Sequence, residues 1–304
     1  MSASTEGRAD PASETPRERA VYALYRGAQW LALALPEAVG RGLFDVVAHV
    51  AFRLAPRMRA VVSANQARVL GRDPSDRLVR ESAEEAFELY ARYWFESFRL
   101  PAWSAEELER RTDVVGAEHI DAALEKGRGC VIALGHLGNW DAAGACIARR
   151  GYRVASVNEA LRPRRLFDLF REHREAFGVT IVGLDAPNLG VALAGFLERN
   201  MIVALLADRD LSGRGVEVEM FGATRRIPSG PASLALSSGA PLLLCSVATT
   251  GRGWRVRISA PLEIEPTGDR KEDVRALTRR LAAGFERAIA EHPADWHLFQ
   301  PAWP

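Results

Sequence analysis

The sequence predicts an α/β fold, with a largely parallel central sheet flanked by helices and a helical amino-terminal region. Short apolar runs of strand length alternate with segments of helical character from Cys130 onward. Glycine and polar residues bound these runs and mark the points where strands give way to helices. With 304 residues and 48% hydrophobic content, the chain is long enough to bury a substantial core.

The predicted elements alternate in order along the chain. Residues 130–134 form a strand buried on both faces, and a helix from Asp141 to Arg150 has a polar start and a basic finish. Further strands are predicted at 153–157, 179–184, 201–207, 216–221, 242–247 and 254–258. The remaining helices are predicted at 163–177, 189–200, 228–238 and 271–291. Such alternation indicates a parallel sheet with helices on both faces.

The amino-terminal end is predicted to differ from the rest. Residues 1–17 are rich in Ser, Glu, Pro and Arg and lack the apolar core of a targeting signal, so we expect a flexible tail and no secretory export. Residues 18–304 are predicted to form a single α/β domain, whose residues 18–100 are helical and face a membrane. The longest apolar stretches, such as 30–36, are far shorter than the roughly 20 residues that a membrane-spanning helix needs.

The expected membrane contact depends on charge. Between Ala20 and Arg72, seven arginines stand against Glu37 and Asp45, a balance of +5, and aromatic residues are interleaved with them. A basic amphipathic surface of this kind binds anionic lipid head groups with its apolar face down. We therefore expect this region to lie on an anionic membrane surface. The alternative is that these helices pack on the core and leave their arginines in solvent.

Composition limits the other partners. The net charge of +1 argues against a dedicated nucleic-acid-binding protein. Cys130, Cys146 and Cys245 lie in apolar runs and share no Cys-x-x-Cys spacing. We expect them to be reduced core residues, and we expect no metal site.

A histidine and an aspartate near the first predicted strand are the leading catalytic candidates. His136 follows the strand and Asp141 begins the helix, and positions five apart on one continuous helix would not meet. We therefore expect His136 in the loop, with Asp141 reaching back to hydrogen-bond one ring nitrogen. That carboxylate would fix the tautomer and leave the other nitrogen to take a proton from a substrate hydroxyl. Free amides around Gly138 and Asn139 would face developing negative charge.

Further charged residues follow other predicted strands. Asp208, Arg209 and Asp210 come directly after a buried strand that ends at the same edge of the sheet as His136. Two roles are open for Arg209 and Asp210, a pairing that holds a loop and a part in catalysis. Glu159, at the end of an earlier strand, is a candidate for contact with sugar hydroxyls or with an arginine.

The sequence also resembles a known family. The block His136–Asp141 is similar to the first motif of the bacterial membrane acyltransferases that acylate glycolipids, which include lipid A lauroyl and myristoyl acyltransferases and enzymes acting on phosphatidylinositol mannoside. Further similar blocks follow in the family's order, and together they cover about residues 85–304. They are Asn158–Pro163, Arg171–Glu175, Ala207–Asp210, Val218–Gly222, Pro228–Pro231 and Ala294–Pro301. The phosphatidylinositol mannoside branch matches best, through Leu89–Trp94, Phe98–Pro101 and the closing block.

The resemblance implies a glycolipid O-acyltransferase. Its substrates would be acyl-CoA, with palmitoyl as the acyl group, and a mannose hydroxyl of phosphatidylinositol mannoside. The enzyme would act as a peripheral protein at the cytoplasmic face of the plasma membrane, without a cofactor and without a covalent acyl-enzyme. For Asp208 the resemblance implies a site role, and the matching branch carries a glutamate at this position, one methylene longer.

Arginines are the candidates for binding the anionic donor, because the phosphates of coenzyme A favour bidentate cations. Arg174 and Arg214 rank first, since they lie in or near the blocks similar to the family. Arg164 lies on the same predicted helix as Arg174, and Arg225 and Arg226 precede the Pro228 turn.

Three other functions are considered. A lipid A type acyltransferase with an acyl-carrier-protein donor shares the same motifs. A serine hydrolase would carry a Gly-x-Ser-x-Gly motif, which this chain lacks. A non-catalytic lipid-surface protein would explain only the basic amino-terminal region. His297, in the closing block, is expected to be a packed residue and not a second base.

Overall fold

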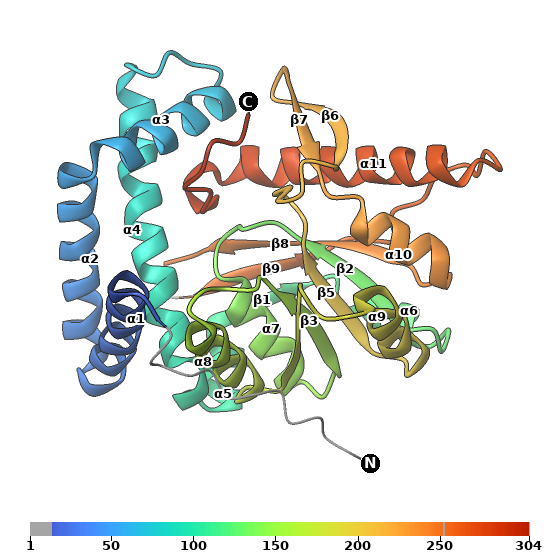
Figure 1. Ribbon diagram of the computed structural model, residues 1–304, viewed down its shortest axis with the longest axis horizontal. Coiled ribbons are helices and arrows are strands. Elements are labelled where there is room, and N and C mark those ends of the chain that lie inside the picture. Colours follow the sequence, from blue (N-terminus) through green and yellow to red (C-terminus); the bar gives the residue numbers. More distant parts are fainter. Residues whose placement is uncertain (1–13, 252, 304) are drawn as a thin grey trace.

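The computed structural model describes residues 14–251 and 253–303, and within them the main sheet has seven strands in the order β1-β9-β8-β2-β5-β3-β4 (Figure 1). Neighbouring strands run parallel except β8 and β9, which pair antiparallel. The largely parallel α/β fold predicted from the sequence is therefore confirmed. The strands are β1 (Thr112–Val115), β2 (Cys130–Leu134), β3 (Val154–Asn158), β4 (Val179–Gly183), β5 (Ile202–Leu206), β8 (Leu242–Thr249) and β9 (Trp254–Ile258).

Helices cover both faces of this sheet and form two separate hydrophobic cores with it. One face carries α5 (Ala105–Arg111), α6 (Ala117–Leu124), α7 (Trp140–Arg149) and α8 (Arg164–Glu175). The other face carries α9 (Leu189–Glu198), α10 (Gly230–Ser238) and α11 (Arg270–Glu291). Strand β2 lies between them and all five of its residues are buried, as expected for a strand covered on both sides.

Four further helices stand together at one side of the sheet (Figure 1, blue to cyan). They are α1 (Pro16–Ala34), α2 (Glu37–Leu54), α3 (Pro56–Leu70) and α4 (Arg77–Arg99). A short 3₁₀ turn, η2 (Leu100–Ala102), follows α4. Local sequence sets the start of α1, since Thr15 and Glu18 form a reciprocal capping box and Pro16 takes the first turn. The predicted helical amino-terminal region is therefore present.

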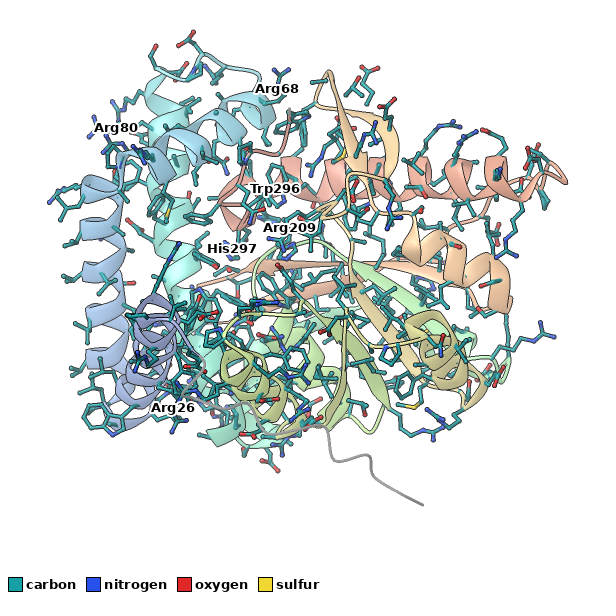
Figure 2. The ribbon with its side chains drawn as sticks, in the orientation of Figure 1. Arg26, Arg68, Arg80, Arg209, Trp296 and His297 are labelled. Carbon is teal, nitrogen blue, oxygen red and sulfur yellow. The ribbon has the colours of Figure 1, made fainter. Side chains whose placement is uncertain are left out.

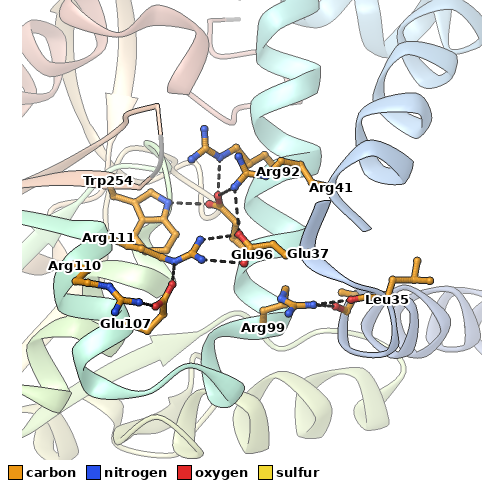
Figure 3. Close-up of polar contacts among 11 residues, drawn as sticks. Leu35, Glu37, Arg41, Arg92, Glu96, Arg99, Glu107, Arg110, Arg111 and Trp254 are labelled. Carbon is orange, nitrogen blue, oxygen red and sulfur yellow. Dashed lines mark hydrogen bonds and ion pairs between the residues drawn. The ribbon is translucent and has the colours of Figure 1, made fainter. Parts of the chain in front are cut away.

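A buried charge network joins these helices to the sheet (Figure 3). Glu96, on α4, is 1% exposed and accepts hydrogen bonds from Arg92 at 2.6 Å and from Arg41, on α2, at 3.2 Å. Its other oxygen accepts the indole N–H of Trp254, on β9, at 2.9 Å. Because one carboxylate binds groups from α2, α4 and β9, this network, which we call the Glu96 clamp, fixes the position of the amino-terminal helices on the sheet.

The structure differs from the sequence prediction at five elements. Helix α5, strand β1 and helix α6 were not predicted. The strand predicted at 216–221 lies outside the main sheet, as β6 (Val216–Met220) in an antiparallel hairpin with β7 (Ala223–Ile227), which was also not predicted. Both hairpin strands alternate exposed and buried residues, the pattern of a two-stranded ribbon with one covered face.

The predicted tail lies mostly outside the described residues, which begin at residue 14, and α1 already begins at Pro16. The single domain over 18–304 stays a prediction. None of the helices within 14–251 and 253–303 combines the length and apolar character that crossing a membrane requires. The three cysteines are buried and carry no disulfide. A 3₁₀ turn, η3 (Pro293–Asp295), follows α11 and begins the closing segment.

Candidate active site

The central pair of the site is His136 and Asp208. Strands β2 and β5 are adjacent and parallel, with Leu134 level with Leu206, so the loops that follow them leave the same edge of the sheet. His136 lies in the loop after β2, and Asp208 lies two residues after β5. The distance from His136 Nδ1 to Asp208 Oδ1 is 2.6 Å. This short contact is a hydrogen bond between an imidazole and a carboxylate.

Asp208 is completely buried and is held in its ionised form. Its second carboxylate oxygen accepts the indole N–H of Trp296 at 2.9 Å. Burial alone would raise the pKa of Asp208, but the charge and hydrogen bond of His136, with the bond from Trp296, lower that pKa well below its usual range. Asp208 is therefore a carboxylate at neutral pH. It accepts a hydrogen bond from the Nδ1–H of His136, so the neutral imidazole has its free lone pair on Nε2.

The closing segment of the chain holds the His136 loop in place. The backbone N–H of His297 donates to the carbonyl of His136 at 2.8 Å, and the N–H of Gly138 donates to the carbonyl of Asp295 at 2.9 Å. Gly138 has a φ of 54°, and an added Cβ would lie 2.6 Å from the carbonyl oxygen of Val247. Only glycine fits this position, so the loop can follow this tight path to α7.

The predicted hydrogen bond between Asp141 and His136 is wrong. Asp141 lies in the first turn of α7 and is bound by Arg174, on α8, whose Nε is 2.7 Å from Oδ1 and whose Nη2 is 3.1 Å from Oδ2. The hydroxyl of Tyr93, on α4, donates to the same Oδ2 at 2.9 Å. The spacing of His136 and Asp141 in the sequence does not indicate in which direction the Asp141 side chain points from the first turn of α7.

The ion pair of Asp141 and Arg174 lies largely out of solvent. Burial raises the pKa of Asp141, but the positive charge and hydrogen bonds of Arg174 outweigh it, and the pKa is lowered. A third donor of Arg174 binds Asn158, at the end of β3, at 2.8 Å. Arg174 therefore ties β3, α7 and α8 together, and its donors are used within the protein.

One of the amides expected to face developing negative charge, the N–H of Gly138, is engaged elsewhere. The N–H of Gly138 binds Asp295, as described above. The side chain of Asn139 accepts the N–H of Ala142 at 2.9 Å and caps α7. The prediction of free backbone donors at Gly138 is therefore wrong.

A largely apolar cavity of about 550 Å³ opens beside His136. It runs over β5 between α9 and α10, and its polar residues include His136, Glu159 and Arg209. The apolar lining includes Val157, Leu184, Leu189, Leu193, Leu205, Leu206, Leu211 and Leu234. Its volume lies within the range of small-molecule sites, and its lining suits a hydrocarbon chain.

Among the other predicted site residues, Glu159 lines this cavity and Arg214 does not. Glu159 lines it and accepts a hydrogen bond from Arg209, and their carboxylate and guanidinium form an ion pair. Arg214 is exposed in the loop after β5, which Asp210 holds by accepting three hydrogen bonds from Ser212 and Gly215. Asp210 thus holds this loop through Ser212 and Gly215, whereas Arg209 pairs with Glu159 and not, as one of the two open roles had it, with Asp210.

Two further predicted residues do not line the cavity. Arg164 begins α8, lies over the ring of Phe167 at 4.6 Å and approaches Asp168 and Asp185. Arg174 lines a different, much smaller cavity together with Asp141.

His297 is a packed residue, as the sequence predicted. Its ring lies 5.3 Å from Tyr90, 5.8 Å from Tyr93 and 6.1 Å from Trp140, measured between ring centroids. Burial and the nearby charge of His136 lower the pKa of His297 to about 3. It is therefore neutral at physiological pH.

Sequence reasoning missed Trp296 as the second partner of Asp208. Figure 2 shows Trp296 in the closing segment, between α4 and the β6–β7 hairpin. A buried tryptophan needs an acceptor for its indole N–H, and this requirement was the available signal. Nothing in the sequence indicated which of the many carboxylates would supply the acceptor.

Comparison with known proteins assigns the family. The family model of the bacterial lipid A biosynthesis acyltransferases matches residues 8–304. A phosphatidylinositol mannoside acyltransferase from Mycobacterium tuberculosis is 40% identical over 303 residues, covering 97% of this chain and 92% of that protein. Another from Mycolicibacterium smegmatis is 39% identical over 279 residues, covering 90% of this chain and 88% of that protein. The chain therefore belongs to the bacterial lipid A biosynthesis acyltransferase family.

Proposed function

We propose that this acyltransferase moves a long-chain acyl group, palmitoyl, from acyl-CoA to a mannose hydroxyl of phosphatidylinositol mannoside. The observation that carries the proposal is the position of His136, beside Asp208 and at the lining of an apolar cavity of about 550 Å³. A base and a hydrocarbon site meet there, which is what acyl transfer to a hydroxyl requires. The names of the mycobacterial relatives support the choice of acceptor.

His136 is the base in this mechanism. Its Nε2 takes the proton of the mannose hydroxyl while the oxygen attacks the thioester carbonyl carbon. The tetrahedral intermediate collapses, the carbon–sulfur bond breaks, and the imidazolium returns the proton to the leaving thiolate. The buried carboxylate of Asp208 stabilises the imidazolium, so no covalent acyl-enzyme is needed.

Cations near the cavity have separate roles in the proposal. Arg209 is the cation that lines the cavity with His136, and it faces the developing oxyanion and the polar end of the donor. Glu159 orients Arg209 and contacts acceptor hydroxyls. Arg214, exposed in the adjoining loop, binds donor phosphates, with Arg164 farther out on α8. Asp141 and Arg174 keep the His136 loop in shape.

Helices α1 and α2 place the enzyme on the membrane in this proposal, at the cytoplasmic face of the plasma membrane. Helix α2 packs on α4 through Phe44, Ala48 and Phe52, yet its opposite side is also apolar. Six residues on that side are between 38% and 76% exposed: Val39, Leu43, Val46, Val47, Val50 and Leu54. On α1, Leu24 and Trp30 are likewise exposed. Exposed Arg26, Arg53 and Arg57 accompany this surface and suit anionic head groups.

The test measures thiol release from palmitoyl-CoA with and without phosphatidylinositol mannoside, and the mass of the lipid product. We expect acceptor-dependent release with one added palmitoyl group, and loss of nearly all transfer in His136→Ala. The matched control is His49→Ala, which removes a half-exposed histidine on α2.

Each other outcome points elsewhere. Release without acceptor would identify a thioesterase or a wrong acceptor. Transfer only from an acyl-carrier-protein donor, or only to a lipid A precursor, would assign the lipid A type of activity. Retained turnover in His136→Ala would refute the base assignment.

A further inference from the structure

The β6–β7 hairpin lies outside the main sheet, yet it brings a buried arginine to Asp208. Arg225, on β7, is 4% exposed, and its Nη2 donates to the backbone carbonyl of Asp208 at 2.6 Å. Arg226, the next residue of the strand, faces the other way, is about half exposed and pairs with Glu217 at 2.8 Å. The hairpin therefore presents Arg226 to solvent and Arg225 to Asp208 in the candidate active site.

Arg225 also contacts the second partner of Asp208. Its guanidinium carbon lies 5.3 Å from the ring of Trp296 and 5.3 Å from the ring of Trp303, within the range of cation–π contacts. Trp296 donates its indole N–H to Asp208 Oδ2 at 2.9 Å. Arg225 thus fixes Asp208 twice, directly at its main chain and indirectly through the tryptophan that holds its carboxylate.

The position of Arg225 is unfavourable for a purely structural side chain. Within the described residues, its Nε and Nη1 are buried without a hydrogen-bond partner. Burial lowers the pKa of Arg225, and the negative charge of Asp208 opposes that shift. A methionine or leucine would fill the same space without burying a charge. What an apolar side chain would not supply is the bond to the carbonyl of Asp208 and a positive charge near the carboxylate.

We infer that Arg225 is a positioning residue for the His136–Asp208 pair. The carboxylate of Asp208 has two oxygens, one for His136 and one for Trp296, so a small rotation of Asp208 would break one bond or the other. Arg225 prevents that rotation by fixing the carbonyl of Asp208 and the plane of Trp296. It contacts neither substrate nor His136 in this account, and it acts through Asp208.

The test compares Arg225→Met, Arg225→Lys and the matched control Arg279→Met, which removes an exposed arginine that pairs with Glu272 on α11. One readout is acyl transfer, which depends on the proposed function. The other is the proton resonance of the His136 Nδ1–H bonded to Asp208, observed by NMR in protein with ¹⁵N-labelled histidine. This resonance reports the hydrogen bond whether or not the acyl acceptor has been correctly assigned.

For Arg225→Met we expect kcat to fall about 10- to 100-fold with KM little changed, as for other groups that orient a catalytic histidine from behind. The low-field resonance should shift or broaden. Arg225→Lys keeps the charge but not the planar fork, so it should recover part of kcat and of the resonance. Arg279→Met should match the wild type in both readouts.

A wild-type resonance and wild-type kcat in folded Arg225→Met would overturn the inference. A fall in thermal stability with an unchanged resonance would show that Arg225 serves only the packing of the hairpin, and would overturn it equally. If Arg225→Met does not fold, the resonance of Arg225→Lys decides. An unaltered His136–Asp208 hydrogen bond in Arg225→Lys would show that the planar guanidinium of Arg225 is not needed, and would overturn the inference. A normal resonance in a wild type that transfers no acyl group would instead count against the proposed function.

Discussion

His136 and Asp208 are 72 residues apart in the chain, and their side chains meet at 2.6 Å because β2 and β5 are neighbouring parallel strands. The carboxylate that orients the histidine therefore comes from a different strand and not from the adjacent helix. Asp141, the nearer aspartate in sequence, is instead the partner of Arg174.

Removing the charge of Asp208 tests the pairing directly. Asp208→Asn should lower kcat by about 10²- to 10⁴-fold, because the amide no longer stabilises the imidazolium or selects the tautomer. Because its pKa lies well below the usual range, Asp208 stays ionised throughout the neutral range, and we expect no loss of activity from its protonation there. Steady-state kinetics from pH 6 to 9 checks both points. Full activity in Asp208→Asn would exclude the pairing from the mechanism.

The ion pair of Asp141 and Arg174 should contribute chiefly to stability. Asp141→Asn or Arg174→Met alone leaves a buried charge without its partner, and we expect each to lower the free energy of unfolding by about 3–5 kcal/mol. The double variant should be less destabilised than the sum of the two, because neither charge is left behind. Urea denaturation of the four proteins measures the coupling. Simple additivity would show that the two side chains do not act as a pair.

His297 predicts a loss of stability in mild acid. Its pKa is lowered to about 3 in the folded protein, whereas the unfolded chain binds the proton with a pKa near 6.5. The contribution of His297 to stability is thus fully present above about pH 6.5 and is lost as the pH falls toward 3. At pH 5 the free energy of unfolding should be lower by about 2 kcal/mol than at neutral pH because of this residue.

The control for this prediction is His297→Gln, which removes the titrating group. Urea midpoints at pH 7 and pH 5 should move less in the variant than in the wild type. Because all other acid-sensitive groups remain, an identical pH response in both proteins would show that His297 is accessible to protons in the folded state.

We expect the depth of the apolar cavity to determine which acyl chain length the enzyme prefers. Helix α10 leads from Gly230, at the catalytic edge, back toward the start of β8, so Ser237 lines the cavity about 10 Å farther along than Gly230. Ser237→Leu should therefore shorten the preferred acyl chain. Each methylene that no longer fits costs about 0.8 kcal/mol of binding.

Competition between palmitoyl- and lauroyl-CoA, with product masses as the readout, gives a ratio that is independent of enzyme concentration. We expect the ratio to shift toward lauroyl. An unchanged ratio would mean that the acyl chain occupies another part of the molecule.

The exposed apolar side of α2 predicts binding to anionic vesicles. Val46→Asp combined with Val50→Asp should abolish sedimentation with such vesicles at low salt and leave thermal stability nearly unchanged, since both residues are about half exposed. Val115→Asp, at a similarly exposed valine on β1, is the control and should still sediment. Equally poor sedimentation of the wild type with anionic and neutral vesicles would argue that α2 meets a protein and not a lipid.

The sequence was most informative where local pattern decides structure. Runs of buried apolar residues located β2 and β5, and capping and glycine signals placed the helices between them within a few residues. His136 could be selected because it follows such a strand. The hairpin β6–β7 was harder to predict, because the alternation of exposed and buried residues along a strand does not indicate which sheet the strand joins.

The partners of buried polar groups could not be predicted in the same way. Asp141 and Asp208 are both acidic residues at element ends near the same edge, and only the packing of α4 and α8 against α7 decides which one binds Arg174. The bond from Trp296 to Asp208 joins residues 88 positions apart. Local sequence carries no signal for contacts of this range.

The Glu96 clamp has a consequence for how a surface-bound enzyme would work. Because Glu96 ties α2 and α4 to β9, the amino-terminal helices cannot tilt independently of the sheet. An enzyme anchored through α2 would hold His136 at a constant height above the bilayer and could acylate successive lipids without dissociating. Its turnover would then follow the mole fraction of acceptor within the bilayer plane and not the bulk lipid concentration.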